Sequence, residues 1–365
     1  MRKSVLVVTL AVLALVVGFM LVYRERSARA GTVDLDRALL ALLPPQATSL
    51  IGADIARLKG TPLYRHMEEQ SKADGKSRNQ IDEFVALTGF DPRRDVEELL
   101  MASWVEGNEP QFVAVARGRF PIAALSREIL QNKGRVENYR GVQVFGPEAR
   151  PRPQLGPDAG ERRKRLEGQA APARRDEHGE FAFLDDRTAL AGSRFGVRSA
   201  IDRKLGGGPS LLGNTALLSR AQSIASSNQV WAVSQRPGEI VAKALPQDGP
   251  ANASNFARIF SSMQYSTFAL DLLNGLDLKA SGLCRSAEDA KTLADAARGI
   301  VALGRLTLSQ KEPEMMTVFD GIQVSEKGEE LEILVHIERQ AFENLLEKSR
   351  TKTPVRTVSA GVPQR

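Results

Sequence analysis

Cysteine and histidine are almost absent from this chain. Cys284 is the only cysteine among 365 residues, so no intramolecular disulfide can form. No cysteine lies near the end of the N-terminal apolar segment, which excludes lipid attachment at a mature N-terminal cysteine. The histidines His66, His178 and His336 are distant in sequence, and His66 lacks the second histidine at i+4 that a metalloprotease helix needs. The sequence therefore predicts neither a metal site nor a bound cofactor.

Motifs for nucleotide binding and for catalysis are missing as well. No strand precedes Gly206–Gly208 and no Lys-Ser/Thr pair follows it, so the run predicts a helix stop rather than a phosphate loop. No G-x-S-x-G pattern marks a serine hydrolase. The acidic pairs Asp34/Asp36 and Asp185-Asp186 could do acid–base work, but they fall at a helix start and in a hairpin turn, where aspartate is favoured anyway. The catalytic residues, if there are any, stay unknown at this stage.

Excess charge of one sign is also missing from the folded part. The net charge is +6, but residues 1–30 and 147–179 account for all of it, and the remainder has 37 basic and 37 acidic residues. A nucleic-acid binder concentrates positive charge on its folded surface, so we expect no nucleic-acid partner. The run Arg162–Arg165 is typical of a solvated surface segment beside acidic residues. The alternative is a segment that binds acidic lipid or nucleic acid.

Charge is absent altogether from Val5 to Tyr23, a 19-residue apolar run long enough to cross a bilayer. Residues 1–30 therefore predict either a retained signal-anchor or a signal peptide cleaved after Ala30, in the small-x-small sequence Ala28-Arg29-Ala30. The length of the run and the charges that follow it favour the anchor. We expect a membrane contact through residues 5–23, with the body in the periplasm or outside the cell. Cleavage after Ala30 would make the protein secreted or periplasmic.

The rest of the chain divides by composition. Residues 31–45 predict a juxtamembrane helix, with Asp34 as N-cap, that either docks on the body or lies on the membrane surface. Residues 46–227 and 228–350 predict two α+β units, and residues 351–365 a flexible tail. Within the first unit, residues 147–179 have five prolines, fourteen charges and no aromatic residue, which predicts a disordered loop.

Alternating strands and helices predict an α+β fold with antiparallel sheets covered by helices. Hairpins are predicted at 99–120, 265–284 and 321–337, and the second has the strong turn signal Asn274-Gly275. A five-element order recurs around the similar stretches 139–144 and 319–324, which predicts an internal duplication. Trp104, Trp231 and Cys284 are expected to be core residues. The alternative for Cys284 is a reactive thiol with a pKa lowered by the adjacent Arg285.

A resemblance rests on the anchor and on the stretches LPPQATSLIGADIARLKGTPLYRHM, TGFDPRRDVEELLMA and FAFLDDRTALAGS. These resemble uncharacterised bacterial membrane-anchored or secreted envelope proteins with domains of unknown function, over about residues 44–349. The resemblance implies a location and an architecture but no chemistry.

These observations favour a membrane-tethered extracytoplasmic protein that acts as a non-enzymatic binding or scaffold module, with an envelope protein as its partner. Two alternatives stay open: an envelope enzyme with a carboxylate-based site, and a carrier of lipid or another small ligand between the two units. The sequence predicts no oligomeric state.

Overall fold

A computed structural model describes residues 35–73, 75–107, 109–132, 134–147, 179–235, 237, 262–308 and 316–351. This part of the chain is an α+β protein built on antiparallel strands. The predicted anchor at 5–23, nearly all of the predicted loop at 147–179, and the tail after 351 lie outside the described residues. None of the helices that are described has the length and apolar character needed to cross a membrane.

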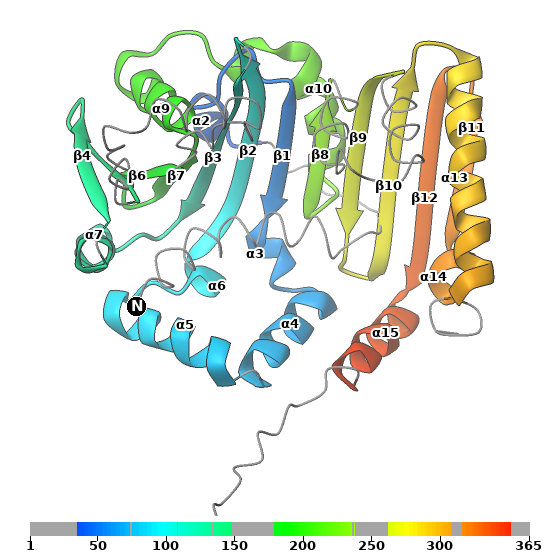
Figure 1. Ribbon diagram of the computed structural model, residues 1–365, viewed down its shortest axis with the longest axis horizontal. Helices are drawn as coiled ribbons and strands as arrows, with labels where there is room; N and C mark the ends of the chain where they lie inside the picture. The colour runs from blue at the N-terminus through cyan, green and yellow to red at the C-terminus, as the bar shows by residue number, and fades with distance from the viewer. Residues whose placement is uncertain are drawn as a thin grey trace, which may run out of the picture. The chain divides into compact units, whose positions relative to one another are not determined.

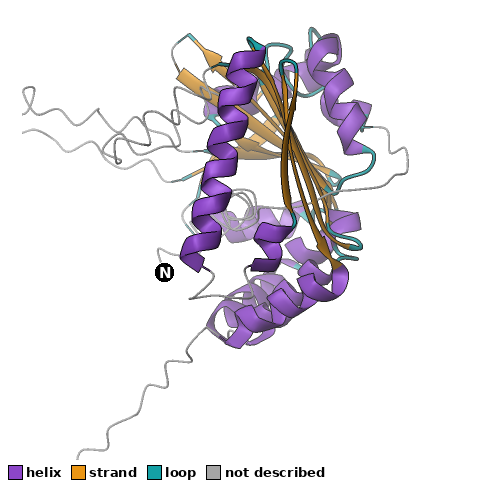
Figure 2. Cartoon of the chain, turned by 90° about the vertical axis from the view of Figure 1, so that its right-hand side faces the viewer, coloured by secondary structure: helices purple, strands orange, loops and turns teal. Residues whose placement is uncertain are grey.

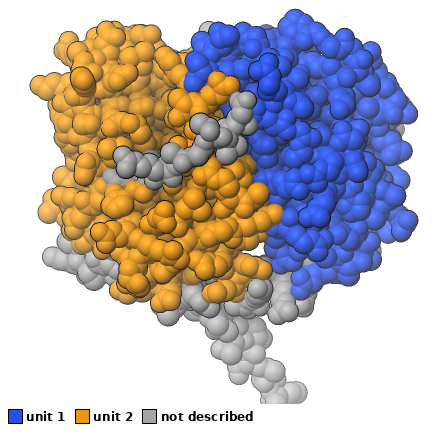
Figure 3. All heavy atoms as spheres, turned by 180° about the vertical axis from the view of Figure 1, so that it is seen from behind, with its two compact units in different colours: residues 1–23, 35–52, 82–219 blue, residues 24–34, 53–81, 220–365 orange. Residues whose placement is uncertain are grey.

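The described residues form two compact units, coloured separately in Figure 3. Unit 1 comprises 35–52 and 82–219, and unit 2 comprises 53–81 and 220–351. The predicted division fell at 227/228 and kept 53–81 in the first unit. The structure groups 53–81 with the C-terminal half, because helix α4 (Pro62–Ala73) packs against helix α15 (Arg339–Thr351).

The strands of unit 1 follow the order β1-β2-β3-β7-β6-β5-β4 (Figure 1). Their bounds are β1 Ser49–Asp54, β2 Val96–Glu106, β3 Glu109–Gly118, β4 Arg135–Tyr139, β5 Val142–Gly146, β6 Glu180–Asp185 and β7 Thr188–Gly192. The helices are α2 Arg37–Leu40, α5 Gly75–Thr88, α6 Pro92–Asp95, α7 Ile122–Gln131, α9 Arg194–Gly206, the 3-10 turn Leu211–Gly213 and α10 Thr215–Ala225. A boundary between the two units falls inside helix α5 and another inside helix α10, so only part of each helix belongs to unit 1.

The short helix α2 falls within the predicted juxtamembrane segment, 31–45. Leu39, Leu40 and Leu43 are fully buried in the core of unit 1. Their burial agrees with the alternative in which this segment docks on the body. Asp36, and not the predicted Asp34, caps the helix, because its carboxylate accepts the amide hydrogens of the next turn, from Ala38 at 2.8 Å among others.

The strands of unit 2 follow the order β11-β12-β10-β9-β8. Their bounds are β8 Val230–Ser234, β9 Met263–Asp271, β10 Gly275–Cys284, β11 Ile322–Lys327 and β12 Glu330–Glu338. The remaining helices are α3 Ile55–Leu58, α13 Ala287–Leu308 and α14 Met316–Asp320. Figure 2 shows α13 running along the strands, where it packs on β11, β12 and β10.

The three predicted hairpins are present with antiparallel pairing. Ser286 caps α13 as its position predicts, because its hydroxyl oxygen accepts the amide hydrogen of Asp289 at 3.1 Å. Gly206 ends α9, and Gly207 and Gly208 have positive φ angles, so the glycine run is the expected helix stop. The sequence did not predict β4, the strand that carries the candidate site described next.

Candidate functional site

The β4–β5 hairpin turns through only two residues, Arg140 and Gly141. Both have positive φ angles, 52° and 88°, which is the geometry that matches the natural twist of a two-residue hairpin. The side-chain oxygen of Asn138 accepts the Gly141 amide hydrogen at 2.8 Å and fixes the turn. Side chains alternate along β4, so Arg135, Glu137 and Tyr139 share one face of the strand.

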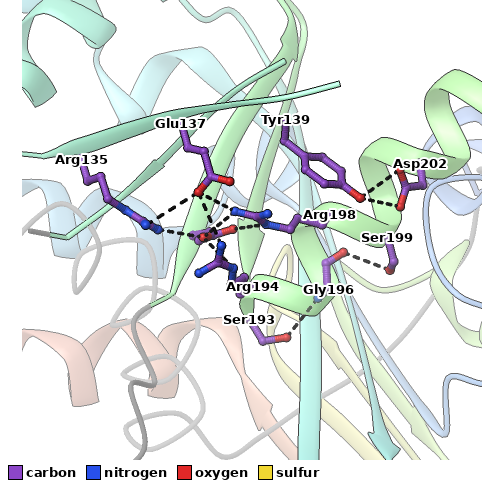
Figure 4. A network of polar contacts seen from close by, with 10 residues as sticks. Arg135, Glu137, Tyr139, Ser193, Arg194, Gly196, Arg198, Ser199 and Asp202 are labelled. Atoms are coloured by element: carbon purple, nitrogen blue, oxygen red, sulfur yellow. Dashed lines mark hydrogen bonds and ion pairs between the residues drawn. The ribbon is translucent and has the colours of Figure 1, made fainter. Parts of the chain in front are cut away.

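That face of β4 meets the N-terminal half of helix α9. Figure 4 shows Arg135 and Glu137 from β4 together with Arg194 and Arg198 from α9. The two helix residues are four positions apart, so they project from the same side of α9. Glu180, the first residue of β6, completes the group. We call Arg135, Arg194 and Arg198, with Glu137 and Glu180, the arginine cluster.

Glu180 anchors the arginine cluster from the inside. Its side chain is only 2% exposed, and all three guanidinium groups bind it: Arg135 at 3.2 Å, Arg198 at 3.2 Å and Arg194 at 3.6 Å. A buried carboxylate requires such partners, because the cost of removing it from water is otherwise large. Glu180 therefore holds the three arginines in fixed places.

Glu137 binds the same three arginines from the solvent side. Its Oε2 lies 2.8 Å from Arg198, 3.5 Å from Arg194 and 3.7 Å from Arg135. Three guanidinium groups thus face two carboxylates, which leaves one positive charge in excess. Arg194 is 56% exposed and Arg135 is 41% exposed, so part of this charge faces solvent.

Electrostatic coupling across the arginine cluster changes the pKa values of its members. The hydrogen bond from Arg198 holds the pKa of Glu137 below its usual range, and the nearby charges of the three arginines lower it further. Burial on its own would lower the pKa of Arg198, but its hydrogen bonds to Glu137 and Glu180 raise it instead. Both shifts favour the charged forms of Glu137 and Arg198.

A second polar group extends the cluster along α9. The Tyr139 hydroxyl donates to Asp202 at 3.0 Å (Figure 4). Arg140 binds the same carboxylate at 2.7 Å. The guanidinium carbon of Arg198 lies 4.8 Å from the centre of the Tyr139 ring, a cation–π contact. The hydrogen bond to Asp202 raises the pKa of Tyr139.

Helix α9 is placed by a close approach to β3. Ser193 caps the helix through its hydroxyl oxygen, which accepts the Gly196 amide hydrogen at 3.2 Å. The Ser193 backbone donates to the Phe112 carbonyl oxygen at 3.0 Å. A Cβ atom on Gly196 would lie 2.3 Å from that same carbonyl oxygen, so only glycine allows this packing.

The two tryptophans and the cysteine are core residues. Trp104, Trp231 and Cys284 are buried, as predicted. Burial, followed by the charges of Asp289 and Glu329, raises the pKa of the Cys284 thiol, which contradicts the alternative of a thiol activated by Arg285.

Among the described residues, the histidines and the members of the acidic pairs form no common metal site. His336 is exposed as predicted and lies 2.5 Å from Asp277, whereas His66 is buried and His178 lies outside the described residues. Asp36 binds Arg117 and caps α2, and Asp185 binds Lys204 at 3.4 Å. The described residues contain no group of three metal-ligating side chains.

Five carboxyls of unit 1 have a lowered pKa, and each is occupied by neighbouring hydrogen-bond donors. They are Asp36, Asp91, Asp95, Glu137 and Asp185. For Asp95 the leading cause is the hydrogen bond from Arg94. For Asp36, Asp91 and Asp185, burial would raise the pKa, and hydrogen bonds outweigh it. A general acid needs a raised pKa, so none of these five suits that role.

These lowered values make unit 1 sensitive to acid. A carboxyl whose pKa is lower in the folded than in the unfolded state stabilises the fold above the unfolded pKa of about 4, and this contribution is lost as the pH falls further. We expect the urea midpoint of unit 1, followed by Trp104 fluorescence, to fall steadily from pH 5 to pH 2.5. In the Asp95→Asn variant the slope with pH should be shallower. An unchanged slope would contradict the assignment for Asp95.

Surface hollows are weaker candidates for a binding site than the arginine cluster. The hollow in unit 2 between α13 and β11 measures about 530 Å³ and is lined by Arg298, Val301, Ala302, Arg305, Leu306, Ile322 and Val324. Both of its arginines already bind carboxylates, Arg298 those of Asp295 and Glu326, and Arg305 that of Asp320. The hollow therefore has no excess charge to select a ligand.

No protein-family model matches the sequence, and a search of curated proteins finds no match. Among solved structures, crystal forms I, IV and III of TP0453 are similar, with TM-scores of 0.43, 0.43 and 0.44 and sequence identities of 11%, 11% and 12%. They cover 87%, 85% and 84% of this chain, and 99%, 95% and 97% of their own chains. A similarity this low carries no functional conclusion.

Proposed function

We propose that the protein is a membrane-tethered, extracytoplasmic binding module of the cell envelope, and that the arginine cluster binds an acidic group of its partner. The observation that carries this proposal is the fixed set of three guanidinium groups against two carboxylates. The buried Glu180 orders the arginines before any partner arrives, so binding does not require them to be immobilised. The excess positive charge and the exposure of Arg194 favour an anionic partner.

The enzyme alternative has less support. The carboxyls of unit 1 with a lowered pKa already bind arginine, lysine or backbone donors, so they are poorly placed for proton transfer. The hollow between α13 and β11 likewise gives the carrier alternative no support, because arginines already paired with carboxylates line it. A binding role requires only the surface that the arginine cluster provides.

We further propose that the two units arose by duplication. The order β1-β2-β3-β7-β6 in unit 1 parallels β8-β9-β10-β12-β11 in unit 2. In the chain a helix follows β3 and β7 in unit 1, and a helix follows the equivalent strands β10 and β12 in unit 2. In this correspondence β6 is the equivalent of β11. The similar sequences at 139–144 and 319–324 would instead make β5 the equivalent of β11. The β4–β5 hairpin is then an insertion particular to unit 1, and it carries part of the arginine cluster. Superposition of experimental structures of the units tests the correspondence.

Cross-linking in intact cells tests the binding role. The full-length protein is compared with its Arg194→Gln variant, and the matched control is Arg187→Gln, which removes a half-exposed arginine that pairs one-to-one with Glu97. We expect a stoichiometric envelope partner whose yield falls several-fold in Arg194→Gln and stays unchanged in Arg187→Gln. Equal yields for all three proteins would contradict a role of the arginine cluster.

Fractionation tests the tether. We expect the full chain to stay with the inner membrane after alkaline extraction, and a chain beginning at residue 31 behind a cleavable signal peptide to be released. Intact mass of the purified protein separates the alternatives. A mass equal to that of the chain with residues 1–30 supports the anchor. A mass equal to that of a chain that begins at Gly31 shows cleavage after Ala30.

A further inference from the structure

We propose that β4 is a docking edge, and that an extended acidic peptide segment of a partner protein pairs with it as an additional strand. This inference rests on the proposed binding function, since the same arginine cluster receives the acidic side chains. β4 is the last strand in the order of unit 1, and no strand of the described residues pairs with its outer side. Strand addition to such an edge is a general mode of peptide recognition.

The hairpin geometry decides which backbone groups of β4 face outward. Tyr139 and Val142 flank the two-residue turn, and in a turn of this type the flanking residues form a hydrogen-bonded pair. Every second residue before Tyr139 then also bonds to β5, namely Glu137 and Arg135. The backbone groups of Val136 and Asn138 point the other way, toward the place where an added strand would lie.

The side chains around this edge select the composition of the added strand. One side of β4 presents Arg135, with Arg194 and Arg198 behind it, and Glu137 neutralises them only in part. An added strand would place every second side chain beside this face, where carboxylates meet the excess positive charge. The opposite side presents Val136, whose side chain is 40% exposed. A peptide that alternates acidic and apolar residues therefore fits both faces.

Charged residues on an edge strand also prevent aggregation, which is a simpler role for the arginines beside β4. The outer strand of unit 2, β11, offers a comparison. Beside it Arg298 binds both Asp295 and Glu326, so arginine does not exceed carboxylate there, and helix α13 packs on the strand. At β4 the arginines exceed the carboxylates, and a buried glutamate holds them in place. Protection of an edge requires neither feature.

Peptide binding to the full chain in detergent tests the inference. The probe is a labelled ten-residue peptide of alternating valine and glutamate, measured by fluorescence anisotropy. The controls are the valine–lysine peptide and a valine–glutamate peptide N-methylated at every residue, which has no amide hydrogen to donate to a strand ladder. We expect binding of the probe alone, weakened by added salt because the contacts are ionic. Equal binding of the N-methylated peptide, or no binding of the probe, would overturn the inference.

Two variants at one position separate strand pairing from charge. Val136→Pro removes an outward amide hydrogen while every bond to β5 remains, and Val136→Ala keeps that hydrogen. We expect the proline variant to weaken binding about three- to ten-fold, the value of one hydrogen bond, and the alanine variant to change it less than two-fold. Equal binding by the two variants would overturn strand pairing. The proposed function would still stand if partner cross-linking in cells depended on Arg194.

Discussion

Replacing Glu180 with glutamine is expected to destabilise unit 1 by about 3 kcal/mol, the lower end of the cost of breaking a buried ion pair. Glutamine keeps the shape of the side chain but removes the charge that three guanidinium groups share. The loss of stability is not larger, because Arg135 and Arg194 are partly exposed and can regain water. Urea unfolding followed by Trp104 fluorescence, in a Trp231→Phe background that leaves one tryptophan in unit 1, measures the change.

Glu137→Gln is the matched control, because Glu137 binds the same arginines but is 36% exposed. Exposed ion pairs contribute little to stability, so this variant should remain close to the wild type in stability. It should also strengthen binding of the valine–glutamate peptide, since the excess positive charge increases. Equal destabilisation by the two substitutions would contradict the view that the buried Glu180 contributes more than Glu137 to the stability of the arginine cluster.

The hairpins of the fold were predictable because their signals are local. Asn274-Gly275 lies between two runs rich in apolar residues, and β9 and β10 pair around it. The hairpin predicted at 99–120 is the pair of β2 and β3, which begins at Val96 and ends at Gly118. Ser286 followed by Glu288 and Asp289 marked the start of α13 in the same local way.

The candidate site was not predictable, and β4 shows why. Its sequence Arg-Val-Glu-Asn-Tyr has one aliphatic residue, because an edge strand with a charged face buries little. The only usable signal was the dipeptide Arg140-Gly141 ahead of the apolar strand β5. The members of the arginine cluster also come from β4, β6 and α9, and nothing in the sequence between Gly146 and Glu180 indicates that these elements meet.

The grouping of 53–81 with the C-terminal unit was hidden for a related reason. Helix α4 packs on α15, almost 280 positions later in the chain, and the pattern of either helix gives no partner. Composition predicts a disordered loop at 147–179, because disorder-promoting residues are a property of a segment, and nearly all of that stretch lies outside the described residues. Contacts between distant segments are properties of the fold and require the structure.

Gly196→Ala is expected to have the second large effect, and to couple the fold to the site. The added Cβ would lie 2.3 Å from the Phe112 carbonyl oxygen, so α9 must move away from β3, at a cost of about 2–3 kcal/mol. That movement carries Arg194 and Arg198 away from Glu180, so peptide binding should fall together with stability. Thermal unfolding and the anisotropy assay measure both effects on the same sample.

Gly206→Ala is the matched control, because it adds the same methyl group to the same helix. No atom lies within 4 Å of the place that the new Cβ would take, and alanine favours helix over glycine, so we expect stability to be unchanged or higher by about 0.5 kcal/mol. Peptide binding should equal that of the wild type. If Gly196→Ala lost stability but kept full binding, the arginines would not depend on the α9–β3 approach, and their placement would have to come from Glu180 alone.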